Sequence, residues 1–402
     1  MVEPVRTDAN DGNAQTPIVR TTTLTLSARI LTLDNARSLW AGFSADDLFG
    51  VAQSLPWVAT WAECVNPKII VAALFDGDNA VLLLPLEIVH QRGARIARYI
   101  GGTHANANFP VMRREYATSI TAADIVVLFQ EIRTADPKLD AVLLTRQLIS
   151  LLDVANPMPA LRTIESPNLA LSFVITSDFE TLIKHRSGAR KLKKMRQQGR
   201  RMDERGGWRC VVAHDDASVD AILDSFFIMK ARRFEEFGLK DTFKASKIRD
   251  FFKTLFRLAA QSPHPIFQLD ALDVGGEILA VAGSSIRHRR NIVEFGAVRA
   301  HEPTLSPGDF LFHQMIKKAV DNEYTAFDFG VGDEAYKRAW CDIETRHADS
   351  MIGFTLRGSI YITLFRWISV AKLTIKRNQF LTAQLKKWRM RNAPKVDTAS
   401  SD

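Results

Sequence analysis

Residues 327–337 read Phe-Asp-Phe-Gly-Val-Gly-Asp-Glu-Ala-Tyr-Lys, and this stretch indicates a strand that ends in a loop able to carry chemistry. Asp328 lies within an apolar run, two glycines free the backbone as it leaves the sheet, and Tyr336 and Lys337 follow. An aspartate can act as a general base or anchor an amine, and a tyrosine can act as a general acid. We therefore expect these three side chains to line one cleft. A strand-to-helix turn with a surface Tyr and Lys is the alternative.

The elements on either side of this segment predict an α/β (α+β) fold. The second half reads as a strand at 171–175, basic helices within 178–205, a strand at 208–213, helices at 218–237 and 246–260, a three-strand meander over 266–299 and a helix at 306–322. The first half reads as a strand at 24–33, helical segments within 36–65, a hairpin over 69–88, a helix at 122–135 and a strand at 139–144. The similar order predicts a tandem duplication without a residue-level repeat.

A chain of 402 residues is too long for one ordinary core. We expect a disordered lead-in over 1–20, domains over 21–165 and 166–356, and a basic helical tail over 357–402, with prolines between 157 and 167 marking the connection. No apolar run is long enough to span a bilayer, and the first residues do not resemble a signal peptide. Three widely spaced cysteines predict neither a disulfide scaffold nor a cysteine-based zinc site. The expected location is the cytoplasm.

The net charge of +8 is concentrated in two segments. Residues 184–209 hold eleven Lys and Arg against two acidic residues, and residues 357–402 hold ten against two. The remainder is net acidic, so the charge does not predict a general nucleic-acid coat, although each basic segment could meet an anion. The sequence has no HExxH, GxSxG or P-loop motif, which disfavours metal, serine and nucleotide hydrolysis. No metal site is expected.

The start of the helix at 306–322 is a candidate anion site. Ser306 and Pro307 suit the N-cap and the first helical position, and Gly308 leaves room beside the free amides of the first turn. Asp309 could satisfy those amides itself and repel phosphate, so plain capping remains the alternative. Phe310 completes the candidate segment.

Four basic residues are candidate substrate contacts. Lys230 and Arg233 fall on the apolar stripe of their helix, where a charge must snorkel, form a pair or face a cleft. We expect them to face the cleft of the 327–337 segment. Arg190 and Lys191 belong to the first basic segment, which could hold a phosphate-rich ligand or could be a solvated helix face.

The chain resembles the CelD-like, cellulose-biosynthesis-associated acetyltransferases, a branch of the GNAT superfamily related to the Fem-type aminoacyl transferases. The matching segments are residues 187–194, 230–238, 306–308 and 328–337, together with 55–61 and 84–86 in the first half, so the resemblance covers most of residues 24–356. Two features depart from the family. Lys230 and Phe234 stand where the family commonly has His and Trp, and the pyrophosphate loop is reduced to residues 306–308.

The resemblance implies tandem GNAT-like domains, each a mixed, mostly antiparallel sheet flanked by helices. It also implies transfer of an acyl group from a coenzyme A thioester, with acetyl-CoA the expected donor, to an amine or hydroxyl of a small metabolite or of a sugar or polysaccharide precursor. Asp328 would be the base, with Glu294 on the strand at 291–299 as the alternative base. Residues 306–310 would receive the pyrophosphate.

Two other functions remain open. A Fem-type transferase would use charged tRNA, held by the basic segment 184–209. Under a non-enzymatic hypothesis, the protein is a scaffold of an envelope-polysaccharide apparatus, anchored by its basic C-terminal helix. The sequence does not specify the acyl acceptor.

The tail has helical periodicity. Apolar side chains recur between residues 359 and 390, among them Ile360, Leu364, Trp367, Ile368, Ala371 and Ile375, and basic residues are spread through the segment. This face either packs on the second domain or lies on an anionic membrane, which would make the protein peripheral to the inner membrane.

Overall fold

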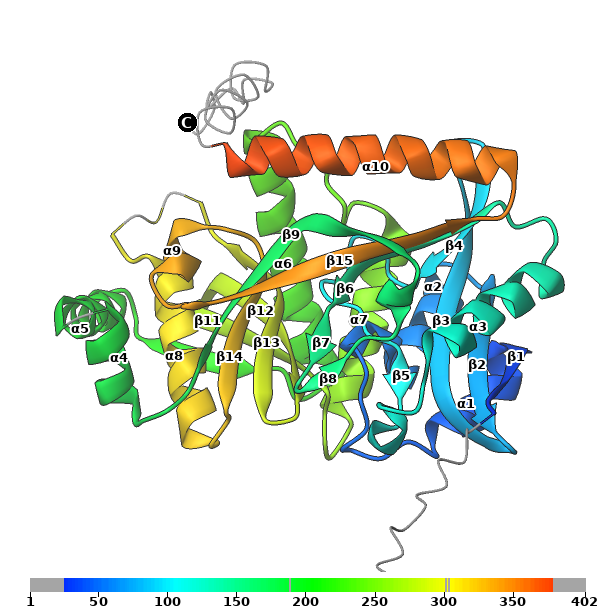
Figure 1. Cartoon of the computed structure of the whole chain (residues 1–402). Helices are drawn as coiled ribbons and strands as arrows, with labels where there is room; N and C mark the ends of the chain where they lie inside the picture. Colours follow the sequence, from blue (N-terminus) through cyan, green and yellow to red (C-terminus); the bar gives the residue numbers. More distant parts are fainter. Residues whose placement is uncertain (1–24, 188, 301, 303, 379–402) are drawn as a thin grey trace, which may run out of the picture.

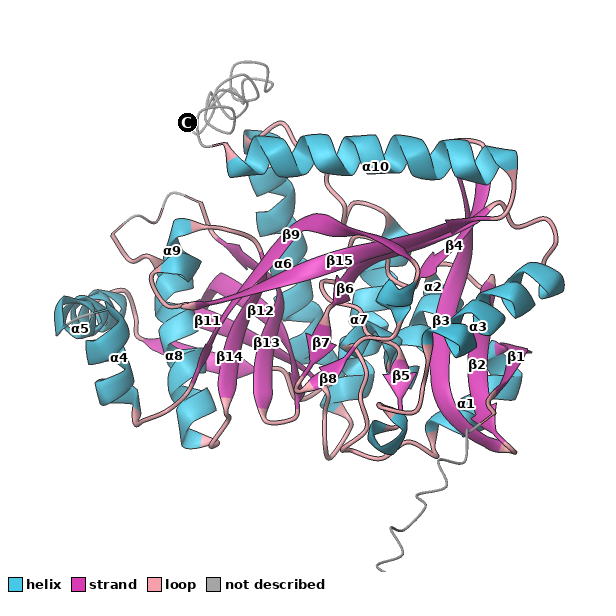
Figure 2. Ribbon diagram, in the orientation of Figure 1, coloured by secondary structure: helices cyan, strands magenta, loops and turns pink. Residues whose placement is uncertain are grey.

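The computed structural model describes residues 25–187, 189–300, 302 and 304–378. These residues form a mixed 13-stranded sheet in the order β1-β2-β3-β4-β6-β15-β9-β14-β13-β12-β11-β10, with β5 (Val111–Met112) beside β3, and helices flank the sheet (Figures 1 and 2). The expected α/β fold is confirmed. The expected lead-in over 1–20 and the tail from residue 379 onward lie outside the described residues.

The two halves of the chain repeat one order of elements. The first half comprises β1 (Ser27–Thr32), α1 (Leu33–Trp40), α2 (Leu55–Cys64), β2 (Ile69–Asp76), β3 (Asn79–Gln91), β4 (Ala94–Tyr99), α3 (Ala122–Ala135) and β6 (Ala141–Leu148). The second comprises β10 (Trp208–Val212), α6 (Asp216–Glu236), α7 (Ser246–Ala260), β11 (Phe267–Val274), β12 (Glu277–Arg287), β13 (Arg290–Val298), α8 (Pro307–Asp321) and β14 (Ala326–Val331). In each half, four antiparallel strands precede a helix and a fifth strand that is parallel to the fourth. The repeated order is the tandem arrangement that the sequence predicted.

Two long strands join the halves by exchange. β9 (Arg162–Val174) follows β6 in sequence but pairs with β14, and β15 (Ile343–Gly353) follows β14 but pairs with β6. The two strands also pair with each other. The sheet is therefore continuous, and the expected boundary at residue 165 falls inside β9. Pro167, expected in a connecting loop, lies in β9 beside a register shift, where a residue without an amide hydrogen is tolerated.

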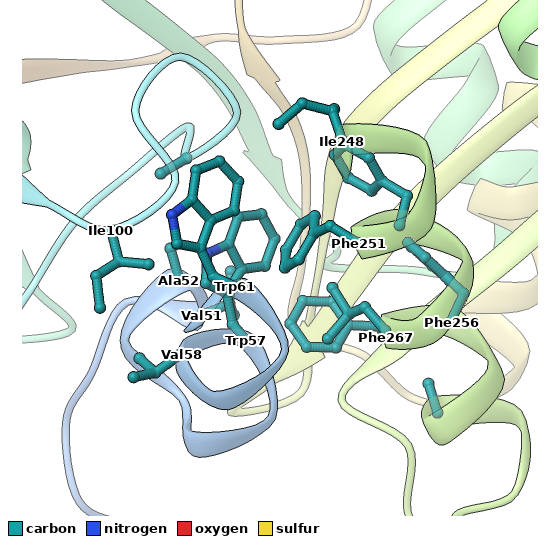
Figure 3. Close-up of a cluster of buried hydrophobic side chains, with 14 of the residues drawn as sticks. Val51, Ala52, Trp57, Val58, Trp61, Ile100, Ile248, Phe251, Phe256 and Phe267 are labelled. Atoms are coloured by element: carbon teal, nitrogen blue, oxygen red, sulfur yellow. The ribbon is translucent and has the colours of Figure 1, made fainter. Parts of the chain in front are cut away.

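A shared aromatic core packs α2 of the first half against α7 of the second (Figure 3). The Trp57 ring meets Phe251 edge-on at 5.0 Å between centroids, and Trp61 meets the same ring at 4.9 Å. Trp57 is 2% exposed and also lies 5.9 Å from Phe267. Because each ring buries a large apolar area, this contact fixes the halves relative to one another.

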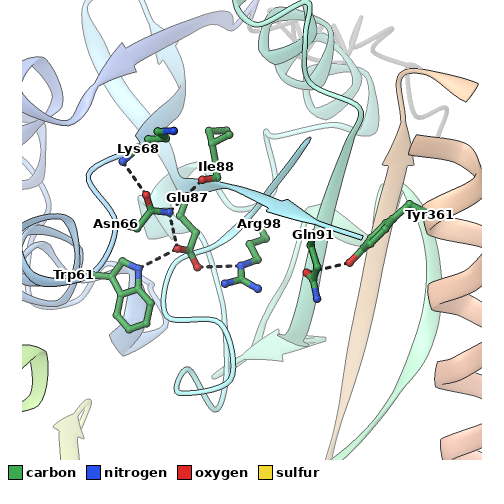
Figure 4. Close-up of polar contacts among 8 residues, drawn as sticks. All are labelled: Trp61, Asn66, Lys68, Glu87, Ile88, Gln91, Arg98 and Tyr361. Atoms are coloured by element: carbon green, nitrogen blue, oxygen red, sulfur yellow. Dashed lines mark hydrogen bonds and ion pairs between the residues drawn. The ribbon is translucent and has the colours of Figure 1, made fainter. Parts of the chain in front are cut away.

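A buried carboxylate secures α2 to the sheet (Figure 4). Glu87 on β3 accepts hydrogen bonds from the Trp61 indole, the Asn66 amide and the Arg98 guanidinium, each at 3.0 Å. A buried charge is tolerated when it is paired and hydrogen-bonded in this way.

The remaining described elements frame the sheet. They are the short strands β7 (Ser150–Leu151) and β8 (Val154–Ala155) and the helices α4 (Phe179–Ser187), α5 (Ala189–Asp203), α9 (Ala335–Arg338) and α10 (Leu356–Arg377). Helix α10 runs across β15, β9, β4 and β6, so it packs on strands of both halves rather than on the second alone (Figure 1). None of the helices within the described ranges combines the length and apolar character that crossing a bilayer requires.

Candidate active site

A cavity of about 1070 Å³ opens where β13 and β14 stop pairing. The two parallel strands pair only from Arg290 to Ile292 on β13 and from Ala326 to Asp328 on β14. Beyond that point residues 293–298 of β13 and Phe329 and Val331 of β14 line the cavity. Its other walls come from α6, from the start of α8, from α9 and from residues 103–106 of the first half.

Glu294 presents a carboxyl group to this cavity from β13. It accepts hydrogen bonds from Ser285 Oγ at 2.7 Å and from Asn106 Nδ2 at 2.9 Å. Burial raises the pKa of Glu294 to about 7, with a smaller contribution from the nearby charge of Asp328, while the two hydrogen bonds oppose the increase. Near neutral pH this carboxyl group can both accept and release a proton.

The first half supplies one wall through the loop that follows β4. Arg146 donates hydrogen bonds to the carbonyl oxygens of Thr103 and Ala105, at 3.0 and 2.9 Å, and so holds the loop that carries His104 and Asn106. His104 packs edge-on against Phe243 at 5.0 Å. Burial and the Arg146 charge lower the pKa of His104 to about 4, so the ring is neutral at pH 7. Sequence reasoning missed this loop, although Gly101-Gly102 after the alternating segment 94–100 was an available signal.

The corresponding opening in the first half is filled by protein. There β4 and β6 also pair over only three residues. Asn108, which is 1% exposed, donates its backbone amide to the Arg146 carbonyl at 2.9 Å and its side-chain amide to the Thr145 carbonyl at 2.8 Å. Gln53 donates to the Asn108 side chain at 2.8 Å. These hydrogen bonds place Asn108 beside β6 beyond its last pair with β4, so a segment of the protein occupies this position.

Two of the three residues expected at the cleft line the cavity. Tyr336 stacks on Phe312 with centroids 5.7 Å apart, and burial raises the pKa of its hydroxyl group, which therefore stays protonated at neutral pH. Lys337 is buried, donates to the Val331 carbonyl at 2.9 Å and pairs with Glu334 at 3.1 Å. Gly332 makes this possible, since a Cβ there would lie 2.8 Å from Lys337 Nζ.

Asp328 does not belong to the cavity wall, contrary to expectation. Its carboxylate accepts the Gly330 amide at 2.7 Å, which stabilises the turn out of the sheet. Burial raises its pKa. Because residues alternate sides along a strand, the flanking Phe329 reaches the cavity while Asp328 does not.

The first turn of α8 contributes Ser306, Pro307, Gly308 and Asp309 to the cavity. Ser306 is the N-cap residue and Pro307 the first helical residue, as expected, but Ser306 has φ 44° and its side chain makes no capping hydrogen bond. Gly308 packs on β13, where an added Cβ would lie 2.5 Å from Val298 Cγ1. Asp309 pairs with Lys194 at 3.4 Å, which partly neutralises it.

Phe310, the last residue of the candidate segment 306–310, does not line the cavity. Phe310 is 1% exposed and packs edge-on against Trp208 at 4.8 Å, in the core rather than in the cavity. Helical geometry explains this, because residues that follow one another along a helix point in different directions.

The four basic candidates divide into two pairs. Lys230 and Arg233 line the cavity as expected; Lys230 donates to the Gly296 carbonyl at 3.0 Å, and Arg233 lies exposed at the rim. Burial and the Arg233 charge lower the pKa of Lys230. Arg190 and Lys191 are not in the wall. Arg190 is exposed on α5, and Lys191 directs its ammonium group over the Trp340 ring, 4.1 Å from the centroid.

Comparison with known proteins finds a family match within the second half. Residues 189–338 match the family model described as an acetyltransferase (GNAT) domain. No curated protein matches the chain by sequence.

Solved structures extend the likeness to both halves. FemX has a TM-score of 0.56 at 11% identity, covering 84% of this chain and 99% of that chain. A conserved protein of unknown function from Bacteroides thetaiotaomicron has a TM-score of 0.50 at 12% identity, covering 82% and 100%. At these identities the likeness concerns the fold. The comparisons do not distinguish the CelD-like branch.

Among the residues that the structure describes, no three His, Cys, Asp or Glu side chains gather as a metal ion would require.

Proposed function

We propose that the protein transfers an acyl group from a coenzyme A thioester, with acetyl-CoA as the expected donor, to an amine or hydroxyl of a small acceptor. The acceptor class we favour is a small metabolite or a sugar or polysaccharide precursor, as the CelD-like resemblance implies. The observation that carries the proposal is Glu294, a carboxyl group with a pKa near 7 in the wall of the cavity between β13 and β14 of a GNAT-like domain.

Glu294 is the group we assign as general base. A base works best when its pKa lies near the working pH, because it is then sufficiently ionised and still basic enough to take a proton. Asn106 and Ser285 hold the two carboxylate oxygens, so the proton-accepting orientation is set before an acceptor arrives. In this assignment Glu294 replaces Asp328, whose carboxylate is engaged by Gly330.

The donor side of the cavity fits a phosphate-bearing thioester in part. The first-turn amides of α8 have no partner within the helix and form the positive end of its dipole. Arg233 and Arg299 also line the cavity. Lys194 offsets the charge of Asp309 that would oppose phosphate there. The thioester supplies the acyl group, and we assign Tyr336, which lines the cavity and is protonated at neutral pH, as the acid that gives a proton to the departing thiolate.

The direct test is an acceptor screen with labelled acetyl-CoA over amines, amino sugars and hydroxylated metabolites. The proposal expects label transfer to one acceptor class by the wild type and loss of about 10²–10⁴ in rate for Glu294→Gln. Transfer at an undiminished rate by Glu294→Gln would remove Glu294 from the chemistry.

The runner-up is a transferase that uses aminoacyl-tRNA. The observation in its favour is the solvated basic surface of α5, where six Lys and Arg side chains are exposed, namely Arg190, Lys193, Lys194, Arg196, Arg200 and Arg201. Such a surface would bind RNA through its phosphates, with an affinity that falls steeply as salt rises. Salt-sensitive tRNA binding without binding of coenzyme A would favour this function. If the protein binds neither tRNA nor coenzyme A, the result would favour the hypothesis that it is a non-enzymatic scaffold.

A further inference from the structure

The outward face of α10 carries an exposed apolar stripe. Leu356, Ile360 and Trp367 are 80%, 62% and 72% exposed, and Leu364 and Val370 are exposed between and beyond them. At 100° per residue these five positions fall within about 120° of one another. Large apolar side chains gathered on one helix face in contact with water mark an interaction surface more often than scattered single ones do.

The stripe is not the face that holds the helix on the protein. On the opposite side Gly358 lies so close to the sheet that an added Cβ would meet the Asp140 carbonyl oxygen at 1.8 Å. Ile362 and Ser369 are buried there, and Tyr361 donates a hydrogen bond to Gln91 at 3.2 Å (Figure 4). The Thr355 hydroxyl caps the first turn by accepting the Gly358 amide at 3.1 Å. The helix is thus fixed on the sheet while its apolar stripe faces outward.

The charged side chains of the segment that carries the stripe all have one sign. Residues 356–396 contain ten Lys and Arg and no Asp or Glu. On the helix, Arg357 lies at one border of the stripe and Arg366 at the other. Arg377 also lies on the Arg366 side, where it forms an ion pair with Glu165 at 2.7 Å. Basic residues at the borders of an apolar face can extend toward phosphates while the apolar side chains enter the acyl region.

We propose that this stripe docks on an anionic phospholipid surface, with α10 lying in the plane of the interface. A second copy of the chain is a poorer occupant, because pairing two stripes would bring together two segments of like charge. Attachment of this kind depends jointly on apolar insertion and on lipid charge, and it is reversible. The proposal does not depend on the acyl-transfer function, since no stripe residue lines the cavity.

Vesicle flotation of the full chain tests this proposal. The wild type should float with vesicles of phosphatidylcholine and phosphatidylglycerol. With vesicles of phosphatidylcholine alone, the amount of floated protein should be lower by about tenfold or more. Ile360→Ser/Trp367→Ser should lose binding by about tenfold or more, because it removes two inserting side chains. The matched control is Ile228→Ser, an apolar residue on α6 that is 59% exposed, which should float like the wild type.

Three results would contradict docking of the stripe on a membrane. Equal recovery with both vesicle types, or undiminished flotation of Ile360→Ser/Trp367→Ser, would overturn the proposal. So would a dimer in sedimentation equilibrium that the same double substitution dissociates, because the stripe would then be a contact between copies. Both substituted positions are exposed, so circular dichroism should show an unchanged fold.

Discussion

Replacing Ser285 by alanine should move the pH dependence of catalysis without abolishing it. The Ser285 hydroxyl donates a 2.7 Å hydrogen bond to Glu294, and this bond favours the ionised carboxylate. In the wild type the acidic limb of kcat/KM should have a midpoint near pH 7, the pKa of Glu294. Without the bond the charged form is less stable, the pKa rises and the limb moves to higher pH.

The size of the shift follows from the type of bond. A hydrogen bond to a charged group contributes about 1.5–3 kcal/mol, and each pKa unit corresponds to about 1.4 kcal/mol. We therefore expect a shift of about one unit, at the lower end because water can partly replace the hydroxyl. The rate of Ser285→Ala should fall about tenfold at pH 6 and approach the wild-type rate at pH 9.

The neighbouring Ser284 provides the matched control. It is also buried on β12, but within the described part of the chain its hydroxyl has no hydrogen-bond partner. Ser284→Ala should leave the limb in place. If both variants lose rate equally at every pH with no shift of the limb, the Glu294 assignment is wrong.

Four further substitutions test separate parts of the account. Asp328→Asn removes a like charge near Glu294, so the acidic limb should move to lower pH; a shift to higher pH would contradict this. The folded protein retains a proton on Glu294 that the unfolded chain releases, because burial raises its pKa from 4.5 to about 7. Stability should therefore fall as pH rises between these values, and thermal melts at pH 8 should place Glu294→Gln above the wild type, with the gap closing near pH 4. Tyr336→Phe keeps the ring stacked on its neighbour but should lower kcat by about 10²–10⁴, and an unchanged kcat would exclude the hydroxyl as the acid. Trp57→Ala should reduce the free energy of unfolding in urea by about 3–5 kcal/mol, whereas the exposed Trp367→Ala should leave it nearly unchanged; equal effects would contradict the packing described.

Local patterns predicted the elements whose own residues specify them. Helix α3 has the expected bounds because a capping box at Thr121 and Asp124 precedes an apolar stripe at helical spacing. The bounds of α7 were also predicted, from an apolar face that includes Phe251 and Phe252. The tandem order of elements was also predicted, because it follows from elements that such local patterns specify.

Strand β15 could not be predicted from its residues. His347, Asp349 and Ser350 are buried polar residues, so the strand lacks the apolar alternation that marks a half-buried strand. Its burial depends on β6 and β9, which lie nearly two hundred residues earlier in the sequence. The exchange of β9 and β15 is therefore a property of the assembled sheet.

The candidate site was predictable only in part, for a similar reason. Tyr336, Lys230 and Arg233 were found because each is unusual in its own segment, and all three line the cavity. The Asn106–Glu294 contact joins residues 188 positions apart. Nothing in either segment indicates the other, so Glu294, the base we propose, was named only as an alternative to Asp328.

Calorimetric titration with coenzyme A tests the central claim most directly. The account predicts one site in the wild type and in Glu294→Gln, which changes the base but not the start of α8. It predicts that Gly308→Trp abolishes this binding with the fold retained, because a side chain at position 308 is forced against Val298 at the cavity wall. Failure of the wild type to bind coenzyme A, or an unchanged affinity in Gly308→Trp, would contradict the account.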